Sequence, residues 1–363
     1  MTGIPILSGM PLEELTEQIS PLPRFRAVQI YKWIASGISS FDEMDNLPLP
    51  LRKDLAERFI PRPRAAVQKH LSGDGTIKLA IQFADGARIE AVLLTDNSGR
   101  RTACLSTQAG CPAGCVFCKT GAGFLRDLTS AEIVEQFLQL RTMIDKAALS
   151  DAPPSAAPPT ALPIANIVIM GMGEPLLNLA ELRRALAVIT SAKGLNFSRR
   201  RITVSTCGIA QGIVDLADNG PAVRLALSLT TADEDLRRRL MPITASQSLQ
   251  EVKKALLYFQ ERGGGRVTLE AVLLGGVNTR PEDAFSIANF AKGLDAVINL
   301  IPWNPVKGLE LEGKAICQPS ASEVETFTRE LEKLGLKVTR RFRRGRGVMG
   351  ACGQLGGRRE KRE

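Results

Sequence analysis

The sequence predicts an α/β protein whose centre is an open, partial barrel of six βα units. From Arg101 to about Pro305, short apolar runs alternate with helix-length amphipathic stretches, which is typical of a mainly parallel sheet. Six such units are fewer than the eight that close a barrel, so an open barrel is expected. The length of 363 residues leaves room for further structural units on both sides of this core.

Residues 1–63 predict a small helical domain. Their amphipathic runs are separated by prolines and by a Ser-Gly break, and each run carries apolar residues at helical spacing. A small helical bundle is the simplest arrangement of such runs. The three runs begin at Pro11 and at the starts of the ranges 24–38 and 49–59.

Residues 64–100 predict a β-hairpin linker between this domain and the core. Apolar and polar residues alternate between positions 69 and 95, as in a half-buried strand. The turn signals Ser72-Gly73-Asp74-Gly75 and Asp85-Gly86 interrupt the alternation. We therefore expect two or three antiparallel strands.

The barrel is expected over residues 101–310. The Ala- and Pro-rich stretch 147–163 predicts a mobile insert after the first helix, because its prolines prevent a continuous helix. The first strand is expected to carry Cys104. The later strands are expected at 164–172, 201–206, 223–229, 267–274 and 296–302.

Residues 311–363 predict a C-terminal extension. A helix is expected over 320–334 and a strand over 336–342, followed by a basic, Gly-rich tail. Residues 358–363 carry charges of both signs and are expected to be disordered.

Charge and composition narrow the function classes. Lys and Arg outnumber Asp and Glu by 47 to 38, a net charge of +9 that favours an acidic partner such as nucleic acid. Aromatic residues make up only 5%, too few for an RNA reader that stacks several bases. No window approaches the roughly 18 apolar residues of a membrane span, so no membrane association is expected.

The seven cysteines are an odd number, and the first residues lack the charged and apolar regions of a signal peptide. We therefore expect thiols, cluster ligands or redox catalysts in a reducing cytoplasm rather than structural disulfides.

The sharpest motif is Cys111-Pro-Ala-Gly-Cys115-Val-Phe-Cys118. Three thiolates this close in sequence must converge on one metal ion or one small metal cluster. Zinc would need a fourth ligand, yet the next cysteine is Cys207 and the only histidine is His70, far upstream. A 4Fe-4S cluster on three thiolates leaves one iron open for a ligand. A zinc site with a remote fourth ligand remains the alternative.

Further segments accompany this motif. They are FRAVQIYKWI at 25–34, FDEMDNLP at 41–48, CLSTQAGC at 104–111, GMGEPLLN at 171–178, IPWNP at 301–305 and ACGQL at 351–355. The cysteine motif after the first strand of a βα repeat resembles the radical S-adenosylmethionine (SAM) superfamily. Together, the segments resemble the RlmN/Cfr family of RNA adenine methyltransferases over nearly the whole chain. The resemblance implies a radical SAM barrel, SAM as cofactor, and a 4Fe-4S cluster on Cys111, Cys115 and Cys118.

The resemblance also implies a mechanism that uses two further cysteines. Carbon 2 or carbon 8 of adenine has no lone pair to attack a sulfonium, so a carbon radical is needed. In the family, the cysteine matching Cys352 takes a methyl group from one SAM, and a radical from a second SAM abstracts hydrogen from that methyl. The resulting radical adds to the base. The cysteine matching Cys104 then resolves the adduct as a disulfide with Cys352, which thiols reduce.

Other family positions map onto strand ends, where a barrel places its site. The resemblance implies that Glu90 is a proton acceptor, although its gap to Cys104 is one residue longer than in the family. Taken alone, Glu90 could equally be a solvated strand residue. The positions implied to bind SAM are Gly173, Glu174, Ser205, Ser228, Leu229, Thr230 and Asn304.

Two departures from the family pattern bear on the substrate. Thr230 stands where the family usually has histidine after Ser-Leu. Residues 344–349 read Arg-Gly-Arg-Gly-Val-Met where the family usually has acidic residues. The loop before Cys352 is therefore more basic, which could change RNA contacts or the target base.

Arginine clusters are candidate RNA contacts, because phosphate neutralisation supplies affinity that does not depend on sequence. Taken alone, arginine triplets on helices are often only solvated faces. The cluster near Cys352 is the preferred candidate, since RNA must reach that sulfur. The clusters are 199–201, 237–239, and positions 340, 341, 343, 344 and 346.

The resemblance implies methylation of adenine carbon 2 in 23S rRNA, and possibly in tRNA, with the N-terminal domain as an RNA-binding accessory. Methylation at carbon 8 and a non-catalytic zinc or RNA-binding protein are the alternatives. A flavodoxin- or ferredoxin-type electron donor, a monomeric state and a cytoplasmic location complete the expectations.

Overall fold

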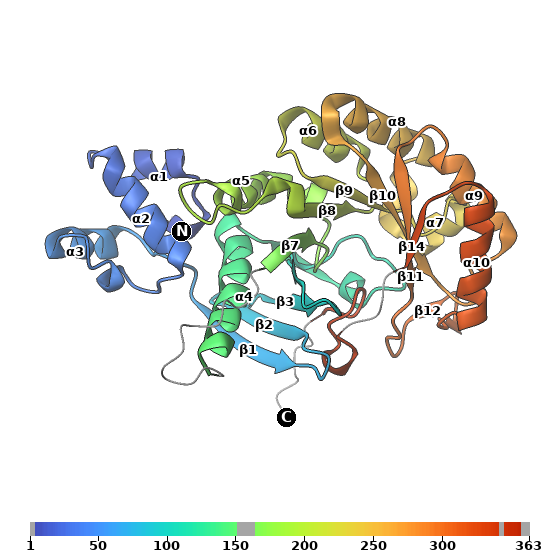
Figure 1. The fold of residues 1–363 in the computed structure, drawn as a ribbon, viewed down its shortest axis with the longest axis horizontal. Coiled ribbons are helices and arrows are strands. Elements are labelled where there is room, and N and C mark those ends of the chain that lie inside the picture. The colour runs from blue at the N-terminus through green and yellow to red at the C-terminus, as the bar shows by residue number, and fades with distance from the viewer. Residues whose placement is uncertain (1–3, 151–163, 341–344, 357–363) are drawn as a thin grey trace.

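The computed structural model describes residues 4–150, 164–340 and 345–356, and a ten-stranded sheet forms its centre (Figure 1). The strand order is β1-β2-β3-β4-β7-β8-β9-β10-β11-β14. From β4 to β14 every neighbouring pair is parallel, whereas β1 to β4 pair antiparallel. The edge strands β1 and β14 do not pair in the described part, so the expected open, partial barrel is confirmed.

The six expected parallel strands are present, and a seventh strand, β14, extends the sheet. β10 is buried along most of its length because helices cover its outer face, as in other parallel sheets. The parallel strands are β4 (Arg101–Cys104), β7 (Ile164–Ile169), β8 (Ile202–Thr206), β9 (Arg224–Ser228), β10 (Val267–Leu273), β11 (Ala296–Pro302) and β14 (Val338–Arg340).

Helices between these strands cover the outside of the barrel (Figure 1). α8 shows how local sequence fixes the start of such a helix, because Ser248 and Glu251 form a capping box there. α4 continues through Ser150, so the first residues of the expected 147–163 insert are helical, and 151–163 lie outside the described residues. The helices are α4 (Ser130–Ser150), α5 (Leu179–Thr190), α6 (Ala210–Asn219), α7 (Glu234–Leu240), α8 (Leu249–Phe259), α9 (Pro281–Ala291) and α10 (Ala321–Lys333).

The N-terminal helices lie at one end of the molecule (Figure 1). They meet the barrel where the chain passes close to α4: a Cβ on Gly9 would lie 2.4 Å from the Ala131 nitrogen. Only glycine fits this approach. The N-terminal elements are η1 (Leu7–Gly9), α1 (Leu12–Gln18), α2 (Arg24–Ser36), η2 (Phe41–Glu43) and α3 (Leu49–Arg58).

Three antiparallel strands follow and extend the barrel sheet beyond β4. They are β1 (Ala65–Leu71), β2 (Ile77–Phe83) and β3 (Arg88–Thr95). The turns after β1 and β2 contain Gly75 and Gly86, both with positive φ. The remaining short elements near the site are β5 (Gln108–Gly110), η3 (Lys119–Ala122), β6 (Phe124–Asp127), η5 (Arg199–Arg201), β12 (Glu310–Leu311), β13 (Lys314–Ala315) and η8 (Arg346–Val348).

The hydrophobic core is continuous from the N-terminal helices through β2 and β3 into the barrel. Within the part of the chain that the structure describes, no helix combines the length and hydrophobicity needed to cross a bilayer.

A buried ion pair joins the N-terminal unit to α4. Arg62 donates through Nε and Nη2 to the two carboxylate oxygens of Glu135, at 2.8 Å each. The side chains are only 9% and 2% exposed. Arg62→Ala would leave the Glu135 charge buried without a cation, so we expect the free energy of unfolding to fall by about 3–5 kcal/mol in urea denaturation.

The matched control is Arg58→Ala, which removes an arginine from a pair with Asp54 whose side chains are 38% and 50% exposed. That pair is expected to contribute less than about 1 kcal/mol. Equal losses for the two variants would contradict the assigned role of Arg62.

Candidate active site

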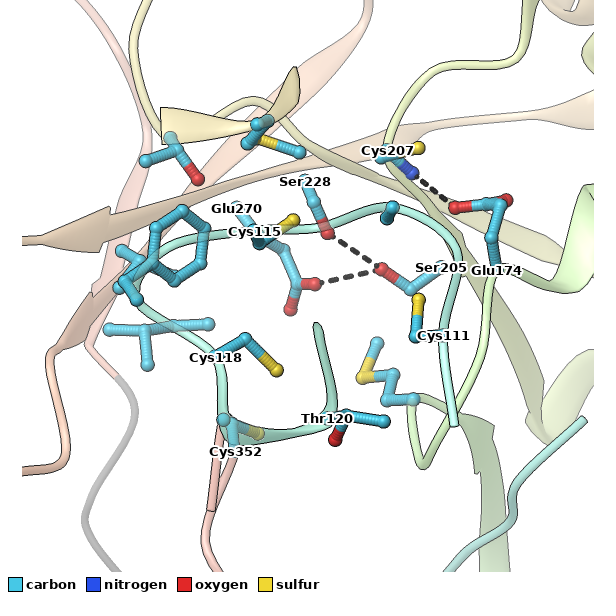
Figure 2. A pocket seen from close by; sticks show the side chains of 18 of the residues that line it. Cys111, Cys115, Cys118, Thr120, Glu174, Ser205, Cys207, Ser228, Glu270 and Cys352 are labelled. Atoms are coloured by element: carbon cyan, nitrogen blue, oxygen red, sulfur yellow. Dashed lines mark hydrogen bonds between the residues drawn. The ribbon is translucent and has the colours of Figure 1, made fainter. Parts of the chain in front are cut away.

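The carboxyl ends of the parallel strands surround a cavity of about 160 Å³. Figure 2 shows the thiols of the cysteine motif and of Cys352 around the same space as Ser205, Ser228 and Glu270. The predicted site residues that line the cavity are Cys111, Cys115, Cys118, Gly173, Glu174, Ser205, Ser228, Thr230, Asn304 and Cys352.

Backbone hydrogen bonds from three directions hold the cysteine loop, residues 111–118. The Cys111 amide donates to the Gly123 carbonyl at 2.8 Å, and the Val116 amide donates to the Leu240 carbonyl at 3.0 Å. At the far side, the indole Nε1 of Trp303 donates to the Phe117 carbonyl at 2.8 Å. The loop is therefore shaped by the end of α7 and the end of β11, not only by its own sequence.

The thiols of this loop are partly buried and stay protonated unless a metal takes the place of the protons. Burial raises the pKa of Cys111 to about 11 and raises that of Cys115 further, and negative charge on neighbouring thiols adds to the effect. Metal ligation removes such protons outright. Among the described residues, no three His, Cys, Asp or Glu side chains converge closely enough to hold one metal ion. Three thiols spread around one cavity fit a multinuclear cluster better than a single zinc ion.

The segment 345–356 carries Cys352 to the cavity wall. Asn304 Nδ2 donates to the Cys352 carbonyl at 3.1 Å. The Lys119 amide, directly after the cysteine loop, donates to the Gly353 carbonyl at 2.9 Å. Gln354 Nε2 donates to the Pro305 carbonyl at 3.2 Å. Cys352 is thus held between the cysteine loop and the end of β11.

Gly173 and Glu174 follow β7 and form one wall. Gly173 has φ of 107°, and a Cβ there would lie 2.7 Å from Gln108 Cβ, so the turn admits only glycine. Glu174 accepts from the amides of Leu176 at 3.0 Å and Cys207 at 2.8 Å. Burial raises the pKa of Glu174. Its carboxylate therefore ties the end of β7 to the end of β8 while facing the cavity.

Ser205 and Ser228 form a hydroxyl pair with Glu270, a residue that the sequence reasoning missed. The two Oγ atoms lie 3.2 Å apart, and Ser205 Oγ donates to Glu270 Oε2 at 3.1 Å (Figure 2). A signal was available: Glu270 is the one charged residue in the expected strand 267–274.

Two buried polar atoms of the wall have no hydrogen-bond partner among the described residues: Thr230 Oγ1 and Asn304 Oδ1. Buried polar atoms are normally paired, so both point to a polar ligand in the cavity. Thr230 also has φ of 60°, which is rare for a β-branched residue and concentrates at functional sites. Hydroxyl and amide groups of this kind fit the amino acid and ribose parts of SAM.

Three predicted residues do not line the cavity. The side chain of Leu229 is buried in the core. Cys104 is buried at the end of β4, and its strand partner Val92 lies near Gly350. Glu90 Oε1 lies 2.8 Å from Lys78 Nζ.

The two arginine triplets differ in how far their side chains are exposed. Arg199–Arg201 are exposed. Arg237 is 3% exposed and donates to the carbonyls of Cys207 at 2.5 Å, Ser228 at 3.0 Å and Leu229. The expectation that all of 237–239 form a solvated or RNA-binding face is therefore wrong for Arg237. Burial lowers its pKa to about 10, which leaves it charged at neutral pH beside the cysteine loop.

Other expectations concern cysteines and the basic cluster. Cys207, which matches none of the positions that the family resemblance assigns, lines the cavity, whereas Cys317 is exposed. In the basic cluster, Arg340 pairs with Glu325 at 2.6 Å. Positions 341, 343 and 344 lie outside the described residues, as does the tail from 357 onward.

Asp74 anchors the start of the segment that carries Cys352. Its Oδ2 accepts from the Gly345 amide at 2.7 Å, and Oδ1 accepts from the Thr76 amide at 3.1 Å. Although partial burial opposes ionisation, these bonds lower the pKa of Asp74 to about 2. In Asp74→Asn we expect amides of residues 345–356 to exchange with deuterium about ten-fold faster at pH 7, because a charge-assisted bond is lost.

Because the folded pKa is depressed, the stabilisation by Asp74 is complete above its unfolded value of about 3.9 and is lost as pH falls towards 2. The control is Asp96→Asn in the turn after β3, where Asp96 Oδ1 accepts from the Ser98 and Arg100 amides. Unchanged exchange over 345–356 in Asp74→Asn would show that this anchor is not needed.

Comparisons with known proteins agree with this geometry. Residues 105–287 match the family described as "Radical SAM superfamily", and residues 7–60 match "Ribosomal RNA large subunit methyltransferase N-terminal domain". A radical SAM methyltransferase from Sphaerobacter thermophilus has a similar solved structure, with a TM-score of 0.86 and 35% identity, covering 97% of this chain and 99% of that one.

Similar curated proteins cover nearly the whole chain. The probable dual-specificity RNA methyltransferase RlmN of Treponema denticola is 50% identical, over 96% of this chain and 95% of its own length. The Thermus thermophilus protein of the same name is 41% identical, over 95% and 92%. The chain therefore belongs to the radical SAM superfamily and, within it, to the RlmN family of RNA methyltransferases.

Proposed function

We propose that this SAM-dependent RNA methyltransferase methylates carbon 2 of an adenine in 23S rRNA, and also in tRNA, through a methyl group carried by Cys352. The 4Fe-4S cluster and SAM are the cofactors of the superfamily. The dual specificity named for the relatives, at up to 50% identity, supports the inclusion of a second RNA.

One observation carries this proposal: Cys352 lines the same cavity as the three cysteines of the motif. Neither electron transfer nor SAM binding alone requires a thiol that a segment more than 200 residues further along the chain brings to this cavity. Its side chain is only partly buried, so a methyl group on its sulfur could meet both the cofactor and a base.

The other residues hold the reactants. Cys111, Cys115 and Cys118 would ligate the cluster, and Gly173, Glu174, Ser205, Ser228, Thr230 and Asn304 would bind SAM. When bound, these cofactors supply a methyl group and a carbon-centred radical. Arg237 places a positive charge beside Cys115, which favours its thiolate form.

Cys104 is proposed as the resolving thiol. The strand partner of Cys104 is Val92, and a Cβ on Gly350 would lie 3.6 Å from Val92 Cγ1. The loop carrying Cys352 therefore passes close to the end of β4. A movement of this loop towards Cys104 would be needed for the two sulfurs to form a disulfide as the methylated base leaves.

Glu90 is proposed as a proton acceptor, with a second role that its contacts support. Its Oε2 accepts from the Gly356 amide at 2.9 Å, while Oε1 pairs with Lys78. The carboxylate thereby anchors the chain just after the Cys352 loop. A proton transfer that neutralises Glu90 would loosen this anchor.

The remaining expectations stay predictions. We propose that residues 1–63 act as an RNA-binding accessory domain, 64–100 as a linker and 311–363 as the extension that delivers Cys352. A flavodoxin- or ferredoxin-type electron donor, a monomeric state and a cytoplasmic location are proposed with them.

Cys352→Ala is expected to abolish RNA methylation, because no other thiol would carry the methyl group, while absorption near about 400 nm from the cluster persists. Mass spectrometry of digested RNA against 2-methyladenosine and 8-methyladenosine standards measures the product. Cys317→Ala, which removes an exposed thiol outside the cavity, is the matched control and should keep full activity. Full activity in Cys352→Ala would refute the proposal, and an 8-methyladenosine product would assign carbon 8 instead.

Cys104→Ala is expected to stall the reaction after the base is attached to Cys352. A covalent protein–RNA species should then accumulate and be visible as a shifted band in a denaturing gel. The double variant with Cys352→Ala should show none. Normal turnover without accumulation would exclude Cys104 as the resolving thiol.

A further inference from the structure

A second cavity, of about 700 Å³, opens at the amino-terminal ends of the barrel strands. Side chains from β4, β7, β8, β9, β10 and β11 line it, together with the turn after β3. Met170 and Glu270 line both this cavity and the cysteine cavity, so the two meet inside the barrel at their level. We call the second cavity the amino-terminal mouth.

We propose that the RNA substrate enters the barrel through the amino-terminal mouth, and that Glu270 accepts a hydrogen bond from the exocyclic amino group of the target adenine. This inference rests on the proposed function, since it assigns a path and a reading group to the same reaction.

Glu270 has the chemistry to read an adenine. It is 6% exposed, and its oxygens accept only from neutral donors: Ser205 Oγ at 3.1 Å and Asn299 Nδ2 at 3.2 Å. Among the described residues it forms no ion pair, so its charge stays available to a further donor. A buried carboxylate without a cation is costly unless a ligand completes its hydrogen bonds. The exocyclic amine is a donor that carboxylates accept from well.

Polar side chains form part of the wall of the mouth, where a barrel interior is usually filled by bulky aliphatic side chains. Asn166, Thr203, Thr268 and Asn299 line it, each from a different strand. These groups can donate or accept at the edges of a base. A base that leaves its stack needs such hydrogen bonds inside the pocket that receives it.

Arginines surround the opening. Arg201 and Arg224 are exposed and form no ion pair among the described residues, whereas Arg100 pairs with Asp96 and Arg340 pairs with Glu325. Exposed guanidinium groups around a polar cavity match an RNA backbone whose phosphates lie outside while one base points inward.

A substitution of Arg224 tests whether the arginines around the opening, which we call the rim, bind RNA. With a fluorescein-labelled RNA hairpin carrying the target adenine, and without SAM or reductant, we expect Arg224→Glu to weaken binding about ten-fold in fluorescence anisotropy. The negative slope of log affinity against log salt concentration should become smaller in magnitude by about one, as for one lost phosphate contact.

Lys333→Glu is the matched control, because it makes the same change of charge on the outer helix α10, at a side chain 69% exposed. Equal affinities for wild type and Arg224→Glu would overturn the rim assignment. The assignment would also be overturned if Arg224→Glu kept its RNA affinity but flavodoxin reduced its cluster more slowly. That result would mean that the rim binds an acidic protein instead of RNA.

The test of Glu270 compares kcat/KM for two RNAs as a ratio, because a substitution of Glu270 could also disturb Ser205. The RNA carries either adenine or purine, which lacks the amino group, at the target position. Wild-type enzyme should prefer adenine in kcat/KM, and Glu270→Ala should reduce this preference about ten-fold relative to wild type. Effects of Ser205 and of ring reactivity cancel in this comparison.

Glu270→Gln keeps the side-chain size and serves if Glu270→Ala does not fold, with a smaller loss of preference expected. An unchanged preference in the folded variant would overturn the role of Glu270. If wild-type enzyme methylates neither RNA, the proposed function fails, while the anisotropy experiment still tests the mouth.

Discussion

Two hydrogen bonds to the Cys352 loop bring three segments that are far apart in the chain together at one cavity. The Lys119 amide donates to the Gly353 carbonyl, and Asn304 Nδ2 donates to the Cys352 carbonyl. The cysteine loop, the end of β11 and the segment 345–356 thereby position one another. None of these three segments lies in an α-helix or a β-strand at the contact, so their geometry depends on mutual contact. The parallel sheet makes this possible, because it brings all its carboxyl ends to one edge.

Buried charge is the second organising feature of the site. Arg237 has no carboxylate partner among the described residues and is stabilised by three backbone carbonyls at the ends of β8 and β9. Glu174 is buried on the other side of the end of β8, with backbone amides as donors. Such groups are costly to bury, and both lie where a charged cofactor would complete their surroundings.

Much of the fold was predictable because periodicity is a local property. Five later strands of the barrel lie within a few residues of their expected ranges, and the helix expected over 320–334 spans Ala321–Lys333. The cavity-lining roles of Glu270 and Arg237 were not predicted. Glu270 is the one charged residue of a mostly apolar strand, and Arg237 belongs to a triplet that looks like a solvated face. Periodicity cannot tell which strand side faces a cavity or which arginine turns inward.

The sequence by itself was enough to propose the chemistry: it has three closely spaced cysteines expected to hold one cofactor, and two more cysteines within family motifs. Residue identity and short spacing are enough for this, because they are local. Only the tertiary structure decided that Cys352 reaches the cysteine cavity, that Glu90 anchors the chain after it, and that a polar mouth leads to Glu270. These features join residues that are far apart in the chain, so they depend on packing that no short pattern encodes.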